Sequence, residues 1–78
     1  EIMRNVISED LKTFLPKINT KTLIIWGDKD KETPVADAYL IKREVKNSFL
    51  DVLPNVGHRI RLEVPEILVE KIVNFIKL

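Results

Sequence analysis

Two polar stretches of the chain carry the side chains best suited to acid–base chemistry. Asp28 and Asp30 follow the apolar run 22–27, and His58 follows a turn at residues 54–57. A carboxylate beside an imidazole fixes the tautomer of the ring and stabilises the imidazolium that forms when the ring takes up a proton. On their own, two loop aspartates and a histidine after a glycine are more often ordinary surface residues.

The elements that must position these side chains follow the order helix, strand, helix, strand, helix. Residues 22–27 form a continuous apolar run, which is typical of a strand covered on both faces. Residues 49–53 are predicted to form a second strand. Between them, Thr33 as N-cap and Pro34 as first helical residue predict a helix that ends at Asn47. A strand–helix–strand unit favours two parallel strands joined by a right-handed crossover, and hence an α/β fold.

Two further helices flank this unit. The first is predicted to begin at Ser8, whose side chain can cap it, and to end at Pro16. The last begins at Pro65 and has an apolar stripe at the spacing of one helix face. This stripe consists of Leu68, Ile72, Phe75 and Ile76.

The predicted topology brings the candidate residues together. Ligands of open α/β sheets sit beyond the carboxyl ends of the strands. The first strand is followed by Asp28 and Asp30, and the second is followed by the turn that precedes His58. We therefore expect a carboxylate and the imidazole to face each other at the same edge of the sheet.

The predicted sheet has too few strands to be complete. Two strands alone leave both sheet edges open, and residues 23–26 would form a long apolar edge. A chain of 78 residues without disulfides is also marginal as an independent domain. We therefore expect the missing strands to come from a second copy of the chain, from another chain, or from the remainder of a longer protein.

Composition narrows the classes of partner. The chain has 13 Lys and Arg against 12 Asp and Glu, which is too balanced for a nucleic-acid surface. No apolar run approaches the ~20 residues that cross a bilayer, and no signal peptide is visible. The absence of cysteine excludes disulfides, thiolate zinc sites and thiol catalysis. We expect no cofactor, metal, nucleic-acid or membrane partner, and a cytoplasmic setting is compatible with this composition.

The whole pattern resembles the C-terminal part of the α/β-hydrolase fold over residues 11–78. The stretches that carry the resemblance occur in order as Asp10–Ile18, Thr22–Asp30, Thr33–Val35, Val56–His58 and Glu63–Glu66. The 28 positions between Asp30 and His58 are similar to the spacing between the acid and the histidine of that family. The resemblance implies that Asp30 is the triad acid, three residues after Gly27, and that His58 is the general base. Asp28 is the competing acid in the same loop.

The nucleophile that this family uses is missing from the chain. It lies in a Gly-x-Ser-x-Gly turn upstream of the acid and the histidine. The two serines here, Ser8 and Ser48, have no flanking glycines. The resemblance thus predicts that residues 1–78 are the C-terminal part of one hydrolase domain, with a lead-in helix region at 1–18 and a core piece at 22–78. Such a piece would be inactive alone, and the intact hydrolase would act on a carboxylic ester or a related small substrate.

Other functions stay open at this point. A small α/β unit with open strand edges could be a non-enzymatic module that forms a homo-oligomer by pairing strands. A nucleotide-binding domain is disfavoured because the loop at 27–30 lacks the spaced glycines of a phosphate cradle. Asp28 and Asp30 could hold Mg²⁺, although paired loop carboxylates are usually solvated. Arg59 and Arg61 could contact an anionic substrate or be plain surface residues.

Overall fold

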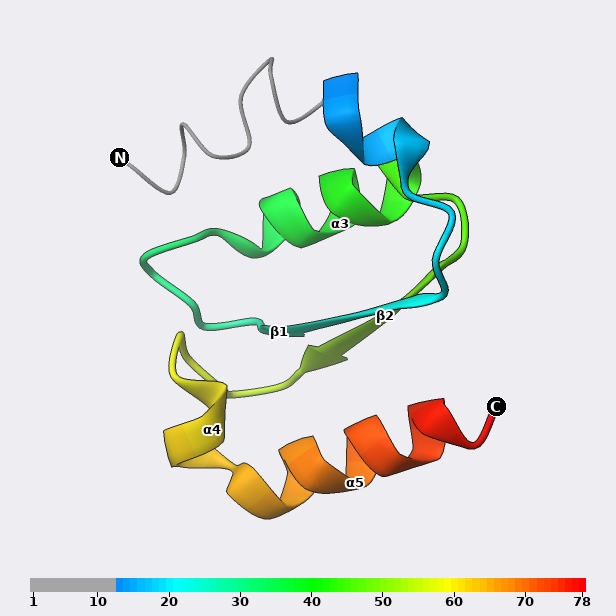
Figure 1. Cartoon of the computed structure of the whole chain (residues 1–78). Coiled ribbons are helices and arrows are strands. Elements are labelled where there is room, and N and C mark those ends of the chain that lie inside the picture. The colour runs from blue at the N-terminus through cyan, green and yellow to red at the C-terminus, as the bar shows by residue number, and fades with distance from the viewer. Residues whose placement is uncertain (1–12) are drawn as a thin grey trace.

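A computed structural model describes residues 13–78 and has the predicted α/β order (Figure 1). Its elements are the 3₁₀ turn η1 (Leu15–Lys17), β1 (Thr22–Gly27), α3 (Val35–Glu44), β2 (Ser48–Leu53), α4 (Ile60–Glu63) and α5 (Pro65–Ile76). Most of the helix predicted from Ser8 lies outside the described residues. Pro16 lies inside η1 rather than at the end of a helix.

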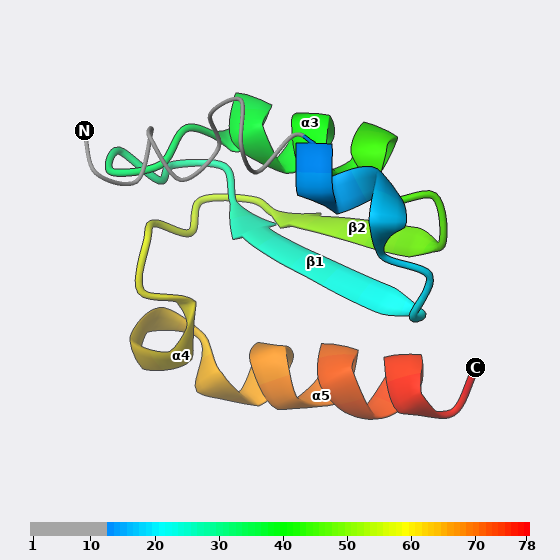
Figure 2. The ribbon, with the colours of Figure 1, turned by 45° about the horizontal axis from the view of Figure 1, so that its top comes forward.

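The two strands are parallel and pair in register from Thr22 opposite Ser48 to Gly27 opposite Leu53. Helix α3 covers one face of this sheet and α5 lies along the other (Figure 2). Because both strands run in the same direction, their carboxyl ends lie side by side, close to α4 (Figure 1). The predicted meeting place of the two polar loops is therefore present. Within residues 13–78, no helix has the length and apolar character needed to cross a membrane.

The core lies between the sheet and α3. Its apolar members are buried and come from η1, both strands, α3 and its C-cap, and the turn after β2: Leu15, Ile24, Ala38, Val45, Leu53 and Val56. Where α3 connects to β2, Val45 and Ser48 are buried, and the Ser48 hydroxyl donates to the carbonyl of Val45 at 2.5 Å. Burial of apolar area on this face is the main stabilising contribution that the described residues provide.

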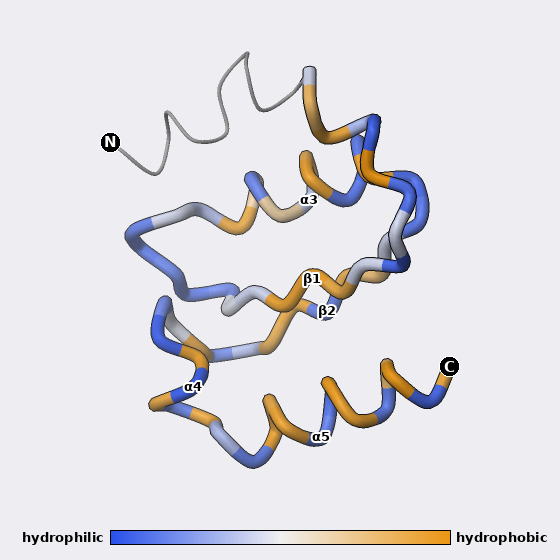
Figure 3. The backbone as a smooth tube through the Cα atoms, in the orientation of Figure 1, coloured by the Kyte–Doolittle hydropathy of each residue, from blue (hydrophilic) through white to orange (hydrophobic). Residues whose placement is uncertain are grey.

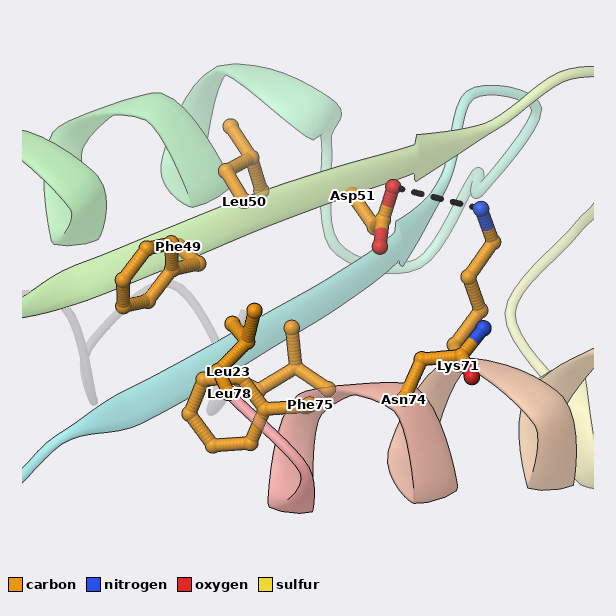
Figure 4. Close-up of a pocket in the computed structure, with 8 residues that line it drawn as sticks. All are labelled: Leu23, Phe49, Leu50, Asp51, Lys71, Asn74, Phe75 and Leu78. Carbon is orange, nitrogen blue, oxygen red and sulfur yellow. Dashed lines mark ion pairs between the residues drawn. The ribbon is translucent and has the colours of Figure 1, made fainter.

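Helix α5 contacts the other face through a few side chains near its C-terminal end. Phe75 packs edge-on against Phe49 of β2 with ring centroids 5.6 Å apart, and Lys71 forms an ion pair with Asp51 at 3.6 Å. Lys21, just before β1, donates to the carbonyl of Phe75 at 3.2 Å and lies 4.8 Å from the centre of its ring. Phe49, Phe75 and the ion pair of Lys71 with Asp51 line an open cavity of about 310 Å³ (Figure 4).

Much of the apolar surface of α5 remains exposed. Hydrophobic residues recur along the helix up to the C-terminus (Figure 3). Of the predicted stripe, Phe75 is half-buried, but Ile72 and Ile76 are 40% and 73% exposed. No residue of α5 is fully buried. The two-stranded sheet is thus too narrow to cover the apolar face that this helix presents.

The structure corrects three local predictions. Helix α3 begins at Val35 with Pro34 as N-cap, so Thr33 does not cap it. The Thr33 hydroxyl instead donates to the carboxylate of Asp30. The helix also ends at Glu44, three residues before Asn47, and the short helix α4 after His58 was not predicted.

The loops that follow the two strands are joined at Gly27. A Cβ atom at this position would overlap the carbonyl oxygens of Val56 and Gly57, so only glycine permits the approach. Beside it, the amide of Asp28 donates to Leu53 at 3.0 Å, and the amide of Lys29 donates to Val56 at 2.9 Å. This junction fixes the position of the histidine loop relative to the end of β1.

Gly27→Ala should therefore destabilise the fold by about 1–3 kcal/mol, the usual cost of an added group in a tight contact. Gly57→Ala is the matched control, because its methyl group would meet the far end of the Glu63 side chain, which can move away. Urea unfolding of both variants and of the wild type measures the difference. Equal losses of stability in the two variants would contradict this account of the junction.

Candidate active site

Asp30 stands at the centre of the loop between β1 and α3. Its side chain is only 6% exposed. Oδ1 accepts the amides of Glu32 and Thr33, both at 2.9 Å, and Oδ2 accepts the Thr33 hydroxyl at 2.9 Å. The fourth bond comes from His58. A buried carboxylate with all four positions used is stabilised in its charged form.

His58 lies directly against this carboxylate. Its Nδ1 is 2.9 Å from Asp30 Oδ2 and 3.5 Å from the Thr33 hydroxyl. Because an ionised carboxylate can only accept, the shared proton lies on Nδ1. The other ring nitrogen, Nε2, then has a free lone pair, and the side chain is 36% exposed. This tautomer is the one that can take a proton from a nucleophile.

Thr33 is a site residue that sequence reasoning assigned to a different role. Thr33 is 4% exposed, and its carbonyl accepts the indole N–H of Trp26 at 2.9 Å. Trp26 thereby holds the segment whose amide and hydroxyl bind Asp30. The available signal was the spacing of Asp30 and Thr33, because aspartate commonly binds amides two and three residues ahead in such turns.

A second set of bonds shapes the loop that holds His58. The amide of Gly57 donates to the carboxylate of Glu63 at 2.8 Å, and the amide of Glu63 donates to the carbonyl of Arg59 at 3.0 Å. Glu63 thus holds together the two ends of the loop of residues 57–63, which contains His58. Upstream, Asn55 has φ of 62°, a left-handed conformation that asparagine tolerates in turns.

The structure separates the two candidate acids. Asp28 is exposed, and its Oδ1 accepts the amide of Asn55 at 2.8 Å, so it fastens the turn after β2. Asp30 is the carboxylate that contacts His58. The preference for Asp30 thus agrees with the geometry of the loop, while the catalytic roles of Asp30 and His58 remain predictions.

Burial, hydrogen bonds and nearby charges shift the pKa values of both Asp30 and His58. Burial alone would raise the pKa of Asp30, but hydrogen bonds from Thr33, His58 and the Glu32 amide outweigh it and hold the pKa below its usual value. The hydrogen bond to Asp30 raises the pKa of His58 above its usual value. Partial burial lowers the pKa of His58, the charges of Asp30 and Glu32 raise it, and Arg59 lowers it.

His58 lines an open hollow of about 490 Å³. Ile25, Ile60 and Leu68 form its apolar walls, and Glu32, Arg59 and Arg61 line its polar part. Both arginines are exposed, and no contact with the pair of Asp30 and His58 distinguishes them from surface residues. Within the described part of the chain, no three His, Cys, Asp or Glu side chains lie together in a way that could hold a metal ion.

Comparison with known proteins places these features in a broader context. No protein-family model matches the chain. It is 33% identical over 76 residues to monoacylglycerol lipase ABHD6 of Mus musculus, covering 97% of this chain. It is 36% identical over 63 residues to the uncharacterized hydrolase YugF of Bacillus subtilis, covering 81% of this chain. The chain spans 23% of the length of each of these curated relatives.

Solved structures with the same fold are also hydrolases. A serine hydrolase involved in carbazole degradation, the CarC enzyme, superposes with a TM-score of 0.83 and 29% identity over 85% of this chain and 26% of that one. A predicted CIB-like hydrolase from Thermoplasma acidophilum superposes with a TM-score of 0.82 and 35% identity, over 87% and 33% of the two chains.

A nuclear magnetic resonance titration can read the pair directly, because His58 is the only histidine. We expect its midpoint to lie above the usual 6.5 and Asp30→Asn to lower it. Since the folded pKa of His58 is raised, its bond to the ionised Asp30 contributes stability that is complete just below the unfolded value of 6.5 and is lost as the pH rises through the folded pKa of His58. Because the pKa of Asp30 is lowered, this contribution is also lost in acid, where Asp30 takes up a proton.

Asp28→Asn is the matched control for this titration. It removes the same charge from the same loop, and the asparagine carbonyl can still accept the amide of Asn55. We expect it to shift the midpoint of His58 less than Asp30→Asn does. A larger shift from Asp28→Asn would show that Asp28 is the main partner of the histidine.

Proposed function

Because this chain has the sequence and fold of a C-terminal segment of an α/β-hydrolase, we propose that it supplies the acid and the base of a catalytic triad. His58 is the general base and Asp30 is the acid that orients it. One observation carries the proposal. Nδ1 of His58 is bound to a buried carboxylate, while the ring is 36% exposed and lines an open hollow.

In this mechanism His58 takes the proton of a nucleophile through Nε2 as the nucleophile attacks the substrate. The imidazolium that forms has its Nδ1–H bonded to Asp30, whose charge stabilises the new positive charge. His58 then returns the proton to the leaving group. Thr33 and Trp26 hold Asp30 in place, so the acid does not have to reorganise during the reaction.

The nucleophile comes from outside the described residues. Ser48 lies at the amino end of β2, opposite to His58, and its hydroxyl is bound to carbonyls of the preceding segment. The Thr33 hydroxyl is buried and donates to Asp30. Neither can reach Nε2 as a nucleophile. Loss of the nucleophile of a serine-hydrolase triad costs about 10⁶-fold in kcat, so the 78-residue chain alone is expected to be inactive.

The substrate that we propose is a carboxylic ester or a related small carbonyl compound. This class fits a triad that forms an acyl intermediate on its nucleophile. It also fits the names of relatives of the chain, a monoacylglycerol lipase and a serine hydrolase. Another relative is a proline iminopeptidase from Pestalotiopsis fici, 34% identical over 77 residues. The proposed class of carbonyl compounds therefore includes amide-like substrates.

A second candidate function is assembly through the uncovered surfaces. The amide of Thr22 donates to Asn47, just before β2, and the amide of Asp28 donates to Leu53 of β2. The alternating residues Leu23 and Ile25 therefore direct their backbone groups to the other edge of β1. Within residues 13–78 no strand pairs with that edge. The free edge and the exposed face of α5 favour a covering partner, either the rest of a hydrolase domain or a second copy.

Ester hydrolysis by the intact hydrolase that contains this segment tests the catalytic proposal. With a p-nitrophenyl ester as substrate, Asp30→Asn should lower kcat on the order of 10⁴-fold, and His58→Ala on the order of 10⁶-fold. Asp28→Asn should lower it far less, because that carboxylate does not contact His58. Full turnover by the His58→Ala enzyme would exclude the proposed base.

Light scattering after size exclusion tests the assembly proposal on the 78-residue chain. We expect a dimer or a larger species, since an uncovered strand edge and apolar helix face favour association. Ile76→Glu should shift the population towards the monomer, because Ile76 is 73% exposed on α5. Lys77→Glu is the control for added negative charge. A folded monomer at all concentrations would reject self-association.

A further inference from the structure

The loop between β1 and α3 places a carboxylate at each nitrogen of His58. Asp30 Oδ2 is 2.9 Å from Nδ1, and Glu32 Oε1 is 3.6 Å from Nε2. The amide of Glu32 donates to Asp30 Oδ1 at 2.9 Å. The carboxylate that binds one side of the ring therefore also fixes the backbone from which the second carboxylate reaches the other side.

The two carboxylates have different surroundings. Asp30 is 6% exposed and has four hydrogen bonds, whereas the Glu32 side chain is 61% exposed and only touches the ring nitrogen. Glu32 can accept a bond from Nε2 only when that nitrogen carries a proton, because a carboxylate has no proton to offer. Its contact is thus selective for the imidazolium form of His58.

We propose that Glu32 is a second anionic partner of His58, which holds the Nε2 side of the protonated ring until a nucleophile takes that place. Asp30 orients the ring in both protonation states, and Glu32 acts on the charged state alone. Glu32 is therefore a positioning residue, and its effect is exerted through His58. The effect on turnover rests on the function proposed above, but the contact itself does not.

Charged side chains from two segments lie around the ring of His58 and affect its pKa. Asp30 and Glu32 come from the loop before α3, Arg59 follows His58 in the chain, and Arg61 of α4 lines the same hollow. The negative charges of Asp30 and Glu32 raise the pKa of His58, and the positive charge of Arg59 lowers it. Because Glu32 is exposed, salt should weaken its influence far more than that of the buried Asp30.

The titration of the single histidine tests this contact in the 78-residue chain without any assay of activity. At low salt, Glu32→Gln should lower the midpoint of His58, by less than Asp30→Asn does, and Glu32→Lys should lower it further. The difference between the wild type and Glu32→Gln should shrink in 0.5 M NaCl. A purely structural role of Glu32 would not give this salt dependence.

Glu44→Gln is the matched control, because Glu44 ends α3 at the opposite end of the sheet and pairs with Arg43. It should leave the midpoint of His58 unchanged. Identical midpoints of the wild type and Glu32→Gln at low salt would overturn the proposal. So would an equal shift from Glu44→Gln, since the effect would then report net charge alone.

In the intact hydrolase, Glu32→Gln should move the acidic limb of the kcat/KM profile to lower pH. Below the midpoint the rate should rise about 1.5- to 5-fold, as expected for loss of one exposed ion pair. An unchanged acidic limb in an enzyme that His58→Ala inactivates would overturn the role of Glu32 in turnover. Full activity of His58→Ala would instead reject the proposed base, and the titration would still decide whether Glu32 binds the ring.

Discussion

The close approach of two backbones at Gly27 is the constraint on which the candidate site depends. The carbonyls of Val56 and Gly57 lie where a side chain at position 27 would be. At the same place, the amide of Asp28 binds the last residue of β2, and the amide of Lys29 binds Val56 in the turn after it. Parallel pairing brings the ends of the two strands to one edge, but this junction determines the spacing of the loops that continue from them. As a result, residues 28 positions apart in the chain come within hydrogen-bond distance.

Neighbouring residues of the loop between β1 and α3 have different structural roles. Asp28 fastens the turn at Asn55, Asp30 binds the histidine, and the Thr33 hydroxyl satisfies the buried carboxylate. Burial of a charged group is tolerated only when its hydrogen bonds are complete, and Asp30 has four partners. Trp26 and Glu63 stabilise the two loops from either side. The contact between Asp30 and His58 is therefore held in place by neighbouring residues of both loops.

The core of the chain is one-sided. The face of the sheet towards α3 contains the buried residues, whereas α5 keeps much of its apolar surface in solvent. A small chain buries a limited fraction of its surface, and a sheet of two strands cannot cover a helix on each face. The chain matches 23% of the length of its curated relatives, and the surfaces it leaves uncovered are a free strand edge and a helix face. Both are surfaces that a larger α/β domain would bury.

The sequence by itself determined the order of β1, α3, β2 and α5, the parallel strands and the end of the sheet at which the polar loops meet. Apolar periodicity, prolines and glycines are local signals, so Thr22–Gly27 and Pro65–Ile76 could be predicted within a residue or two. Only the tertiary structure decided between Asp28 and Asp30 from contacts, because both lie in one loop and the distance to His58 depends on how the chain folds. It also reassigned Thr33, whose hydroxyl could either accept an amide of the helix N-terminus or donate to the Asp30 carboxylate, and does the latter. The contact of Glu32 with Nε2 is of the same kind, since no spacing along the chain fixes which side of a ring a flexible side chain will reach.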